Sequence, residues 1–335
     1  MKWHMNVPKW AGLLIFFCTL PFPFVDASEK RPNILFILSD DHRWDAMSCM
    51  NHSFVKTPHM DRLVAEGAHF ENAFCTTSLC SPSRGTFYTG TYPHKHGVMG
   101  NDVHRDFDPA ITPPWYMLLK QSGYHTGFIG KWHMGKGDHP RPGVDYWLSF
   151  NGQGVYHDPP VNENGEKKKL KGYMTEILTD KAISFLRNRP NNKPFAAVLS
   201  HKAVHAPFTP EEKYKNTYDD DAVKEPPTFQ DDFKGRSPWR MLRYSGTYDN
   251  PITSEKLNNP NFTAKPMNWN SWSPVKEKKF INYFRALLSV DDSIGRVLKE
   301  LEDQKILDNT MIIYAGDNGF FHGEHRRTDK RFAQE

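Results

Sequence analysis

Two pairs of acidic or amide residues stand at the ends of apolar runs and could bind a metal ion together. Asp40 and Asp41 follow the run NILFILS, and Asp317 and Asn318 follow the run TMIIYAG. Oxygen ligands of this kind suit a hard divalent cation, calcium before magnesium or manganese. Either pair alone could instead cap a helix or form a turn, because Asp and Asn do both. Found together at two predicted strand ends, the four residues predict a calcium site.

A set of cationic residues could form a pocket for an oxyanion beside that metal. Its members lie near predicted strand ends or in the loops that follow: Arg84, Lys131, His133, His205 and Lys330. Arginine and lysine next to a metal bind a tetrahedral oxyanion such as sulfate or phosphate. Lys131 and His133 are two positions apart, so an extended chain would point both to the same side. Singly, the lysines could be surface charges and the histidines could form core hydrogen bonds. Zinc is disfavoured, since the chain has no HExxH or CxxC motif.

The stretch CSPSRGTFYTG places a cysteine, Cys80, just before a predicted helix. Pro82 suits the first turn of a helix that begins there. The positive end of the helix and a neighbouring cation would lower the pKa of the thiol and make it reactive. These residues therefore predict a nucleophile beside an oxyanion pocket and a metal, without specifying the ester that is cut.

The elements that must position these residues alternate between strands and helices. Strands are predicted at 33–41 and 310–319, and at the start of 125–133 and of 194–207, each of which runs on into a loop. Helices are predicted at 57–70, 113–124, 173–188 and 280–303, with one more after Cys80. This alternation predicts an α/β fold, a mostly parallel sheet sandwiched between helices. Ligands bind such sheets at the carboxyl ends of the strands, where the acids and cations fall. The aperiodic region 208–275 is predicted to be a long surface insertion.

Composition and the N-terminus bound the class of protein. The 335 residues are 38% hydrophobic and 24% charged with a net charge of +4, and the basic run EKKKLK at 166–171 is predicted to be a solvated loop. No concentrated basic face indicates a nucleic-acid partner. Lys2, Lys9, the run AGLLIFFCTL and Ala27 predict a signal peptide at 1–27, with an uncleaved anchor as the alternative. No other transmembrane segment is predicted, so the body is expected to be secreted, periplasmic or lysosomal.

The cysteine count raises a pairing question. Cys18 lies in the predicted signal peptide, which leaves Cys49, Cys75 and Cys80. An odd number in an exported protein leaves at least one thiol unpaired. Whether Cys49 pairs with Cys75 stays open.

These motifs together resemble one enzyme family, the type I sulfatases of the alkaline phosphatase superfamily. CSPSR at 80–84 fits the family signature C-x-P-S-R, and PNILFILSDD, GKWHMG, HAPF and GDNGFFHGEHRRTDKR match its other blocks in order. The resemblance implies an alkaline-phosphatase-like fold. It also implies that a formylglycine-generating enzyme reads the signature and oxidises Cys80 to formylglycine. One hydroxyl of the hydrated aldehyde would attack sulfur, and the second would expel sulfate.

The resemblance further implies a metal set and a role for the arginine. The calcium ligands would be Asp40, Asp41, Asp317 and Asn318, joined by Cys80 in its converted form. Arg84 would steady the diol and the metal site.

Four further residues match the family's substrate-handling groups. Lys131 and Lys330 would bind the sulfate. His133 would be the base that drives elimination, and His205 the acid that protonates the leaving alcohol.

The resemblance also bears on substrate and completeness. NYFRALLSVDDSIGRVLKELED and HGEHRRTDKR look most like the N-acetylglucosamine-6-sulfatase and mucin-desulfating branch, which implies a glycan 6-O-sulfate as substrate. Family members continue past DKRFAQE into another strand and a small C-terminal subdomain, so we expect a catalytic domain at 28–335 that is incomplete at its C-terminus. The alternatives are a phosphate or phosphonate ester hydrolase of the same superfamily and an inactive secreted glycan-binding fragment.

Overall fold

The computed structural model of the chain describes residues 31–101, 106–219, 222–230, 279–326 and 328–331. The predicted signal peptide at 1–27 lies outside the described residues, as does most of the predicted insertion. Within the described ranges, no helix combines the length and the apolar character needed to cross a membrane.

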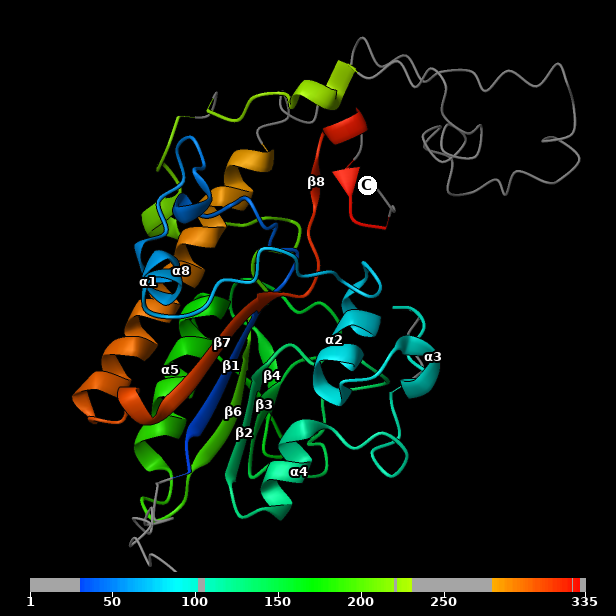
Figure 1. Cartoon of the computed structure of the whole chain (residues 1–335), viewed down its shortest axis with the longest axis vertical. Helices are drawn as coiled ribbons and strands as arrows, with labels where there is room; N and C mark the ends of the chain where they lie inside the picture. The colour runs from blue at the N-terminus through cyan, green and yellow to red at the C-terminus, as the bar shows by residue number, and fades with distance from the viewer. Residues whose placement is uncertain (1–30, 102–105, 220–221, 231–278, 327, 332–335) are drawn as a thin grey trace, which may run out of the picture. The chain divides into compact units, whose positions relative to one another are not determined.

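A seven-stranded sheet positions the site, with the strand order β5-β4-β3-β2-β6-β1-β7. The strands are β1 Asn33–Ser39, β2 His125–Gly130, β3 Tyr146–Ser149, β4 Pro160–Glu163, β5 Glu166–Lys169, β6 Phe195–Ser200 and β7 Thr310–Gly316. The neighbouring strands β3, β2, β6, β1 and β7 run parallel to one another. Strand β4 is antiparallel to β3, and β5 is antiparallel to β4. The parallel strands therefore end at one edge, as Figure 1 shows for β1 and β7 lying side by side.

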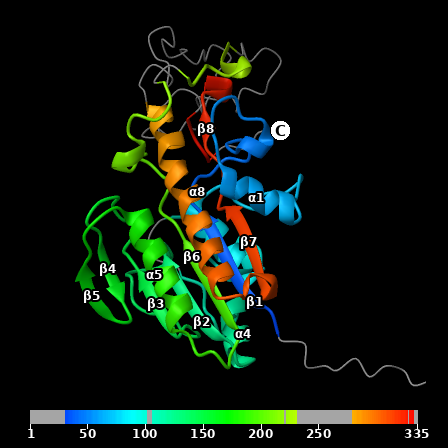
Figure 2. The ribbon, with the colours of Figure 1, turned by 90° about the vertical axis from the view of Figure 1, so that its left-hand side faces the viewer.

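Helices cover both faces of this sheet (Figures 1 and 2). One face carries α1 (Pro58–Glu66), α5 (Met174–Asn188) and α8 (Lys279–Asp303), and the other carries α2 (Cys80–Thr89) and α4 (Trp115–Gln121). The α/β fold with a mostly parallel sheet between helices is confirmed. The remaining described elements are short: α3 Pro93–His96, β8 Phe321–His322, β9 Thr328–Asp329, and 3-10 turns at Ser48–Met50, Glu212–Tyr214, Pro227–Gln230, Leu307–Asn309 and Glu324–Arg326.

Strand β1 shows why both faces need a helix layer. Leu35 and Ile37 belong to the core shared with α5 and α8, whereas Phe36 and Leu38 belong to the core shared with α2 and α4. Successive side chains of a strand point to opposite faces, so a strand buried on both sides reads as a continuous apolar run. On α8, the predicted apolar face is buried, from Phe280 to Leu301.

The basic run at 166–171 is not a loop, which corrects the prediction. Its first four residues form the edge strand β5, which pairs with β4 from Pro160↔Lys169 to Glu163↔Glu166. The two residues between the strands, Asn164 and Gly165, both have positive φ, 52° and 97°. Asn-Gly is the dipeptide that a two-residue hairpin with two positive φ angles favours. The strand lies at the surface, as expected, with all four of its residues exposed.

Candidate active site

The two acidic pairs meet because β1 and β7 are neighbours. Their register joins Ser39 to Gly316, so the residues that follow emerge side by side. The backbone N–H of Asp41 donates to Asp317 Oδ1 at 2.9 Å, and Asn318 Nδ2 donates to Asp41 Oδ1 at 2.7 Å. Asp40, Asp41, Asp317 and Asn318 are all buried. The convergence predicted from the sequence is therefore present.

The acid cluster fits a hard divalent cation. Carboxylate oxygens of Asp40, Asp41 and Asp317 lie within 4.8 Å of one another. Asp41 Oδ2 and Asn318 Oδ1 are buried and accept no hydrogen bond from any described residue. Buried oxygens without partners are costly, and oxygen atoms at this spacing are the ligands that calcium prefers. Burial, reinforced by the Asp40 carboxylate, raises the pKa of Asp317 to about 7.

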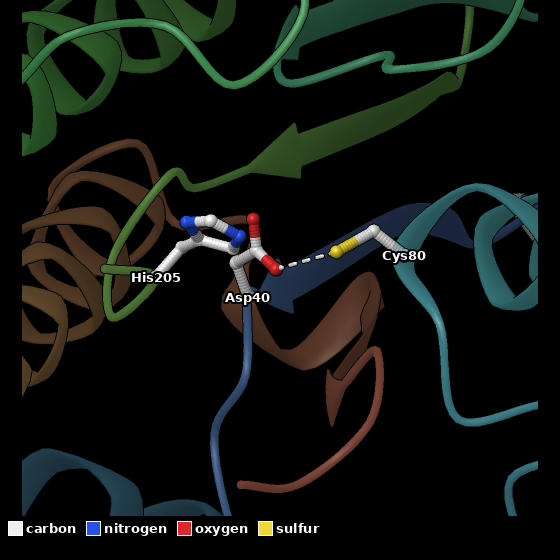
Figure 3. Close-up of side chains that lie close together, drawn as sticks. All are labelled: Asp40, Cys80 and His205. Atoms are coloured by element: carbon white, nitrogen blue, oxygen red, sulfur yellow. Dashed lines mark hydrogen bonds between the residues drawn. The ribbon is translucent and has the colours of Figure 1, made fainter. Parts of the chain in front are cut away.

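Cys80 is the first residue of α2, and its thiol points into the acid cluster (Figure 3). The thiol donates to Asp40 Oδ1 at 3.3 Å, and Lys330 Nζ donates to Cys80 Sγ at 3.0 Å. Burial, together with Asp40, raises the thiol pKa to about 12 in spite of the lysines. The expectation that the helix start and the cations lower this pKa was wrong, because the sulfur is fully buried beside a carboxylate.

Arg84 lies four residues after Cys80 in α2 and connects three strand ends. Its Nε donates to Asp317 Oδ2 at 3.0 Å, and its Nη1 donates to Lys131 O at 3.0 Å and to Ser200 Oγ at 2.6 Å. Burial opposes its charge, but Asp317 and Asp40 outweigh burial and raise its pKa above the ordinary value. The guanidinium holds the acid cluster in place.

Lys131 and Lys330 reach the acid cluster from two sides. Lys131 directly follows β2 and is buried, and its ammonium pairs with the Asp40 carboxylate. Lys330 follows the β8–β9 hairpin, and its ammonium pairs with Asp41. Burial opposes ionisation of Asp40, but Lys131 and the other cations hold its pKa well below the usual range. Burial also opposes the charge of Lys330, but Asp41 and Cys80 raise its pKa.

His133 reaches the site by a different backbone path from the one expected. Its φ is +58°, so the chain after β2 is not extended there, and the argument from alternating side chains was wrong. Its Nδ1 lies 3.4 Å from Ser81 Oγ, and Ser81 Oγ donates to His133 O at 2.5 Å. Burial, then Lys131, lowers its pKa to about 2, so the imidazole is neutral.

His205 stands in the loop after β6, with its ring beside Asp40 in Figure 3. Its Nδ1 lies 2.8 Å from Ala206 O, and its Nε2 lies 3.9 Å from Asp41 Oδ2. A ring nitrogen bonded to a carbonyl oxygen carries the proton, so Nδ1–H is fixed and Nε2 faces the acids. Burial lowers the pKa of His205, and Asp40 opposes that shift.

Sequence reasoning missed a buried lysine in the same loop, Lys202. It is 1% exposed, and its Nζ lies 4.6 Å from the centre of the Tyr156 ring and 3.4 Å from Ala206 O. Burial, then Lys131, lowers its pKa to about 8. The signal was available, because Lys202 comes two residues after the apolar strand β6, much as Lys131 comes directly after β2.

Sequence reasoning also missed Gln153, whose side chain accepts a hydrogen bond from Lys131 Nζ at 2.5 Å. Cys49 and Cys75 are free thiols in the structure, which answers the pairing question.

The comparisons with known proteins agree with this geometry. A family model described as Sulfatase matches residues 32–335. The N-acetylglucosamine-6-O-sulfatase of Bacteroides thetaiotaomicron is 36% identical, over 91% of this chain and 61% of that protein. The N-acetylglucosamine-6-sulfatase of Capra hircus is 28% identical, over 88% of this chain and 52% of that protein.

A solved structure in complex with its substrate, D-glucosamine-2-N,6-O-disulfate, superimposes with a TM-score of 0.73. It shares 35% identity and covers 91% of this chain and 69% of its own. The chain spans between half and about three fifths of the two curated relatives named above. With the match over residues 32–335, the chain belongs to the sulfatase family.

Proposed function

We propose that this chain is the catalytic part of a calcium-dependent sulfatase that hydrolyses sulfate esters of a glycan. The observation that carries the proposal is the position of Cys80. Its sulfur lies 3.3 Å from Asp40 Oδ1 and 3.0 Å from Lys330 Nζ. A nucleophile there would stand between a cation-binding acid cluster and the ammonium groups that neutralise an oxyanion.

The proposed reaction also needs a calcium ion and the conversion of Cys80 to formylglycine. Asp40, Asp41, Asp317 and Asn318 would hold calcium, which would draw charge from the sulfate oxygens. A thiol whose pKa is about 12 is a poor nucleophile at neutral pH. Conversion of Cys80 to formylglycine by a maturing enzyme that reads CSPSR would supply a hydroxyl nucleophile, and a second hydroxyl for the release of sulfate.

The chain's own residues would divide the remaining work. Lys131 and Lys330 bind the sulfate oxygens, and Arg84 keeps Asp317 and Asp40 in place beneath them. His205 acts from its imidazolium form, which the nearby Asp40 and Asp41 carboxylates favour, and gives the Nε2 proton to the leaving alcohol. His133, neutral at physiological pH, accepts a proton from the hydroxyl that expels sulfate.

The proposed substrate is a 6-O-sulfated N-acetylglucosamine of a sulfated glycan. Two relatives carry this specificity in their names, and a solved structure at 35% identity holds a glucosamine with a 6-O-sulfate. We place the protein outside the cytosol, as a secreted, periplasmic or lysosomal enzyme, on the composition of residues 1–27.

The test compares two esters of the same phenol, a sulfate and a phosphate, on chain produced with a maturing enzyme. An oxyanion pocket beside a metal could accept either group, so the leaving group is kept constant. We expect the sulfate ester to be hydrolysed faster. Faster hydrolysis of the phosphate ester would favour the phosphatase alternative. Binding of a sulfated glycan without turnover of either ester would favour the glycan-binding fragment.

A further inference from the structure

A groove beside the candidate site lies between the β3–β4 connection and the edge hairpin β4–β5. Its volume is about 610 Å³. The connection contributes Gln153 and Val155, and the hairpin contributes Lys167, Lys168 and Lys169. Figure 2 shows this hairpin standing at one end of the sheet, away from α8.

One side chain connects the groove to the candidate site. Gln153 lines the groove, and its Oε1 accepts a hydrogen bond at 2.5 Å from Nζ of Lys131. Lys131 in turn pairs with Asp40. A molecule that filled the groove would therefore reach within one side chain of the group proposed to bind sulfate.

The charges of the groove favour an anion. Three lysines line it against a single carboxylate, Asp138. Lys168 is neutralised, since it pairs with Glu163 at 3.3 Å and Glu166 at 3.2 Å. Lys167 and Lys169 form no ion pair with any other described residue, and both are exposed. Their charges are available to a ligand.

The groove also offers an apolar surface and amide groups, which a sugar ring needs. Val155 is 47% exposed, and Pro160, which also lines the groove, is exposed as well. Asn151 and Gln153 add side-chain amides that can bind hydroxyl groups. Apolar patches with convergent polar groups are typical of small-molecule sites.

We propose that this groove is a subsite for the next sugar of the substrate, and that this sugar carries a carboxylate or sulfate bound by Lys167 and Lys169. The inference rests on the proposed function, because it places the sulfate that is cleaved at Lys131. It defines the substrate class more narrowly, as an acidic oligosaccharide and not an isolated sulfated monosaccharide. The basic run at 166–171 would then bind the acidic group of the substrate, which gives a function to an otherwise solvated surface strand.

The test measures binding and does not need turnover. The full chain is made without a maturing enzyme, so that Cys80 stays a thiol, and dissociation constants are measured by calorimetry. The probes are glucosamine 6-sulfate, the same sugar linked to a uronic acid, and the same sugar linked to a neutral hexose. The variant is Lys167→Ala/Lys169→Ala. Its matched control is Lys193→Ala/Lys305→Ala. This double variant removes two exposed lysines that come before β6 and β7 in the chain, at the amino ends of the parallel strands.

The acidic disaccharide should bind the parent chain more tightly than the monosaccharide. In the groove variant this preference should fall about five- to tenfold. The fall should be smaller at high salt, because salt screens two exposed charges. The control variant should keep the preference. Two results would overturn the proposal: an unchanged preference in the groove variant, or an equal loss for the acidic and the neutral disaccharide. Failure of the proposed function would show separately, as matured chain that binds the disaccharide and hydrolyses no sulfate ester.

Discussion

At the scale of single residues, the orientation of His205 decides what it can do. Its Nδ1 is held by Ala206 O at 2.8 Å, and Tyr156 Oη donates to His205 O at 2.7 Å. Both contacts leave Nε2 facing the acid cluster. When its ring is doubly protonated, a histidine fixed in this way can deliver a proton only from Nε2, which suits protonation of a leaving alcohol.

Replacing His205 by alanine should therefore harm poor leaving groups most. A sugar alcohol needs a proton as it departs, whereas nitrophenolate does not. We expect His205→Ala to lower kcat/KM by about 10²- to 10⁴-fold for a sugar sulfate and far less for nitrophenyl sulfate. Steady-state kinetics on both substrates measure the difference, and an equal loss on both would remove His205 from the acid role.

Lys202 is expected to position His205 without touching substrate. Its Nζ lies 3.4 Å from Ala206 O, the same oxygen that holds His205 Nδ1. Lys202→Met should lower kcat/KM for the sugar sulfate about tenfold and for nitrophenyl sulfate less, since one hydrogen bond to a charged donor is lost. Lys202→Arg should recover part of the loss. The control Lys193→Met, at an exposed lysine, should change neither rate. A similar loss on both substrates would indicate a structural role only.

At the scale of elements, the site depends on how β2 and β6 end. Gly130 closes β2 with φ +119°, and a Cβ there would meet Ser200 O at 1.9 Å. The next residue is Lys131, so any shift at Gly130 moves a proposed sulfate-binding group. Only glycine fits this close approach at positive φ.

Gly130→Ala should therefore destabilise the fold, by about 3 kcal/mol or more in free energy of unfolding. Gly152→Ala is the matched control, because Gly152 also has a positive φ, 55°, but a Cβ there would meet no atom within 4 Å. Its cost should be about 1 kcal/mol. Urea denaturation of both variants gives the comparison, and equal midpoints would contradict the contact with Ser200.

Strands and helices could be predicted from the sequence where a short run of residues carries the pattern by itself. The runs before Asp40 and Asp317 are short, apolar and end in acids, and both are strands of the central sheet. Strand β5 was missed because its four residues, EKKK at 166–169, are all polar and exposed, so no alternation of apolar residues marks a buried face. It is a strand because the Asn164-Gly165 turn folds it back on β4.

At the scale of the whole molecule, the strand order and the pKa of Cys80 depend on tertiary packing and could not be predicted from the sequence. Asp41 and Asp317 are 276 residues apart, and they meet because β7 joins the sheet beside β1. No local pattern encodes that strand order. The pKa of Cys80 was also out of reach, because it depends on burial by the assembled sheet and α2, which outweighs the nearby lysines.

The closely packed acids should make the stability of the whole molecule depend on calcium. Binding to the folded chain alone stabilises it by RT ln(1 + [L]/Kd), about 2.7 kcal/mol at 100 times Kd. We expect Tm to rise with calcium, to fall on chelation, and to rise less with magnesium, whose octahedral demand suits this set less well. Thermal unfolding with each ion measures this. An unchanged Tm across calcium concentrations would contradict a calcium site at Asp40, Asp41, Asp317 and Asn318.

The conversion of Cys80 is the most direct test of the account as a whole. Peptide mass spectrometry on the tryptic fragment Leu63 to Arg84 examines it, using chain from a host that makes a formylglycine-generating enzyme. The fragment also contains Cys75, which lacks the C-x-P-x-R context and serves as an internal control. The account predicts formylglycine at Cys80 and an unconverted thiol at Cys75. An unmodified thiol at Cys80 in such a host would contradict the sulfatase mechanism proposed for this chain.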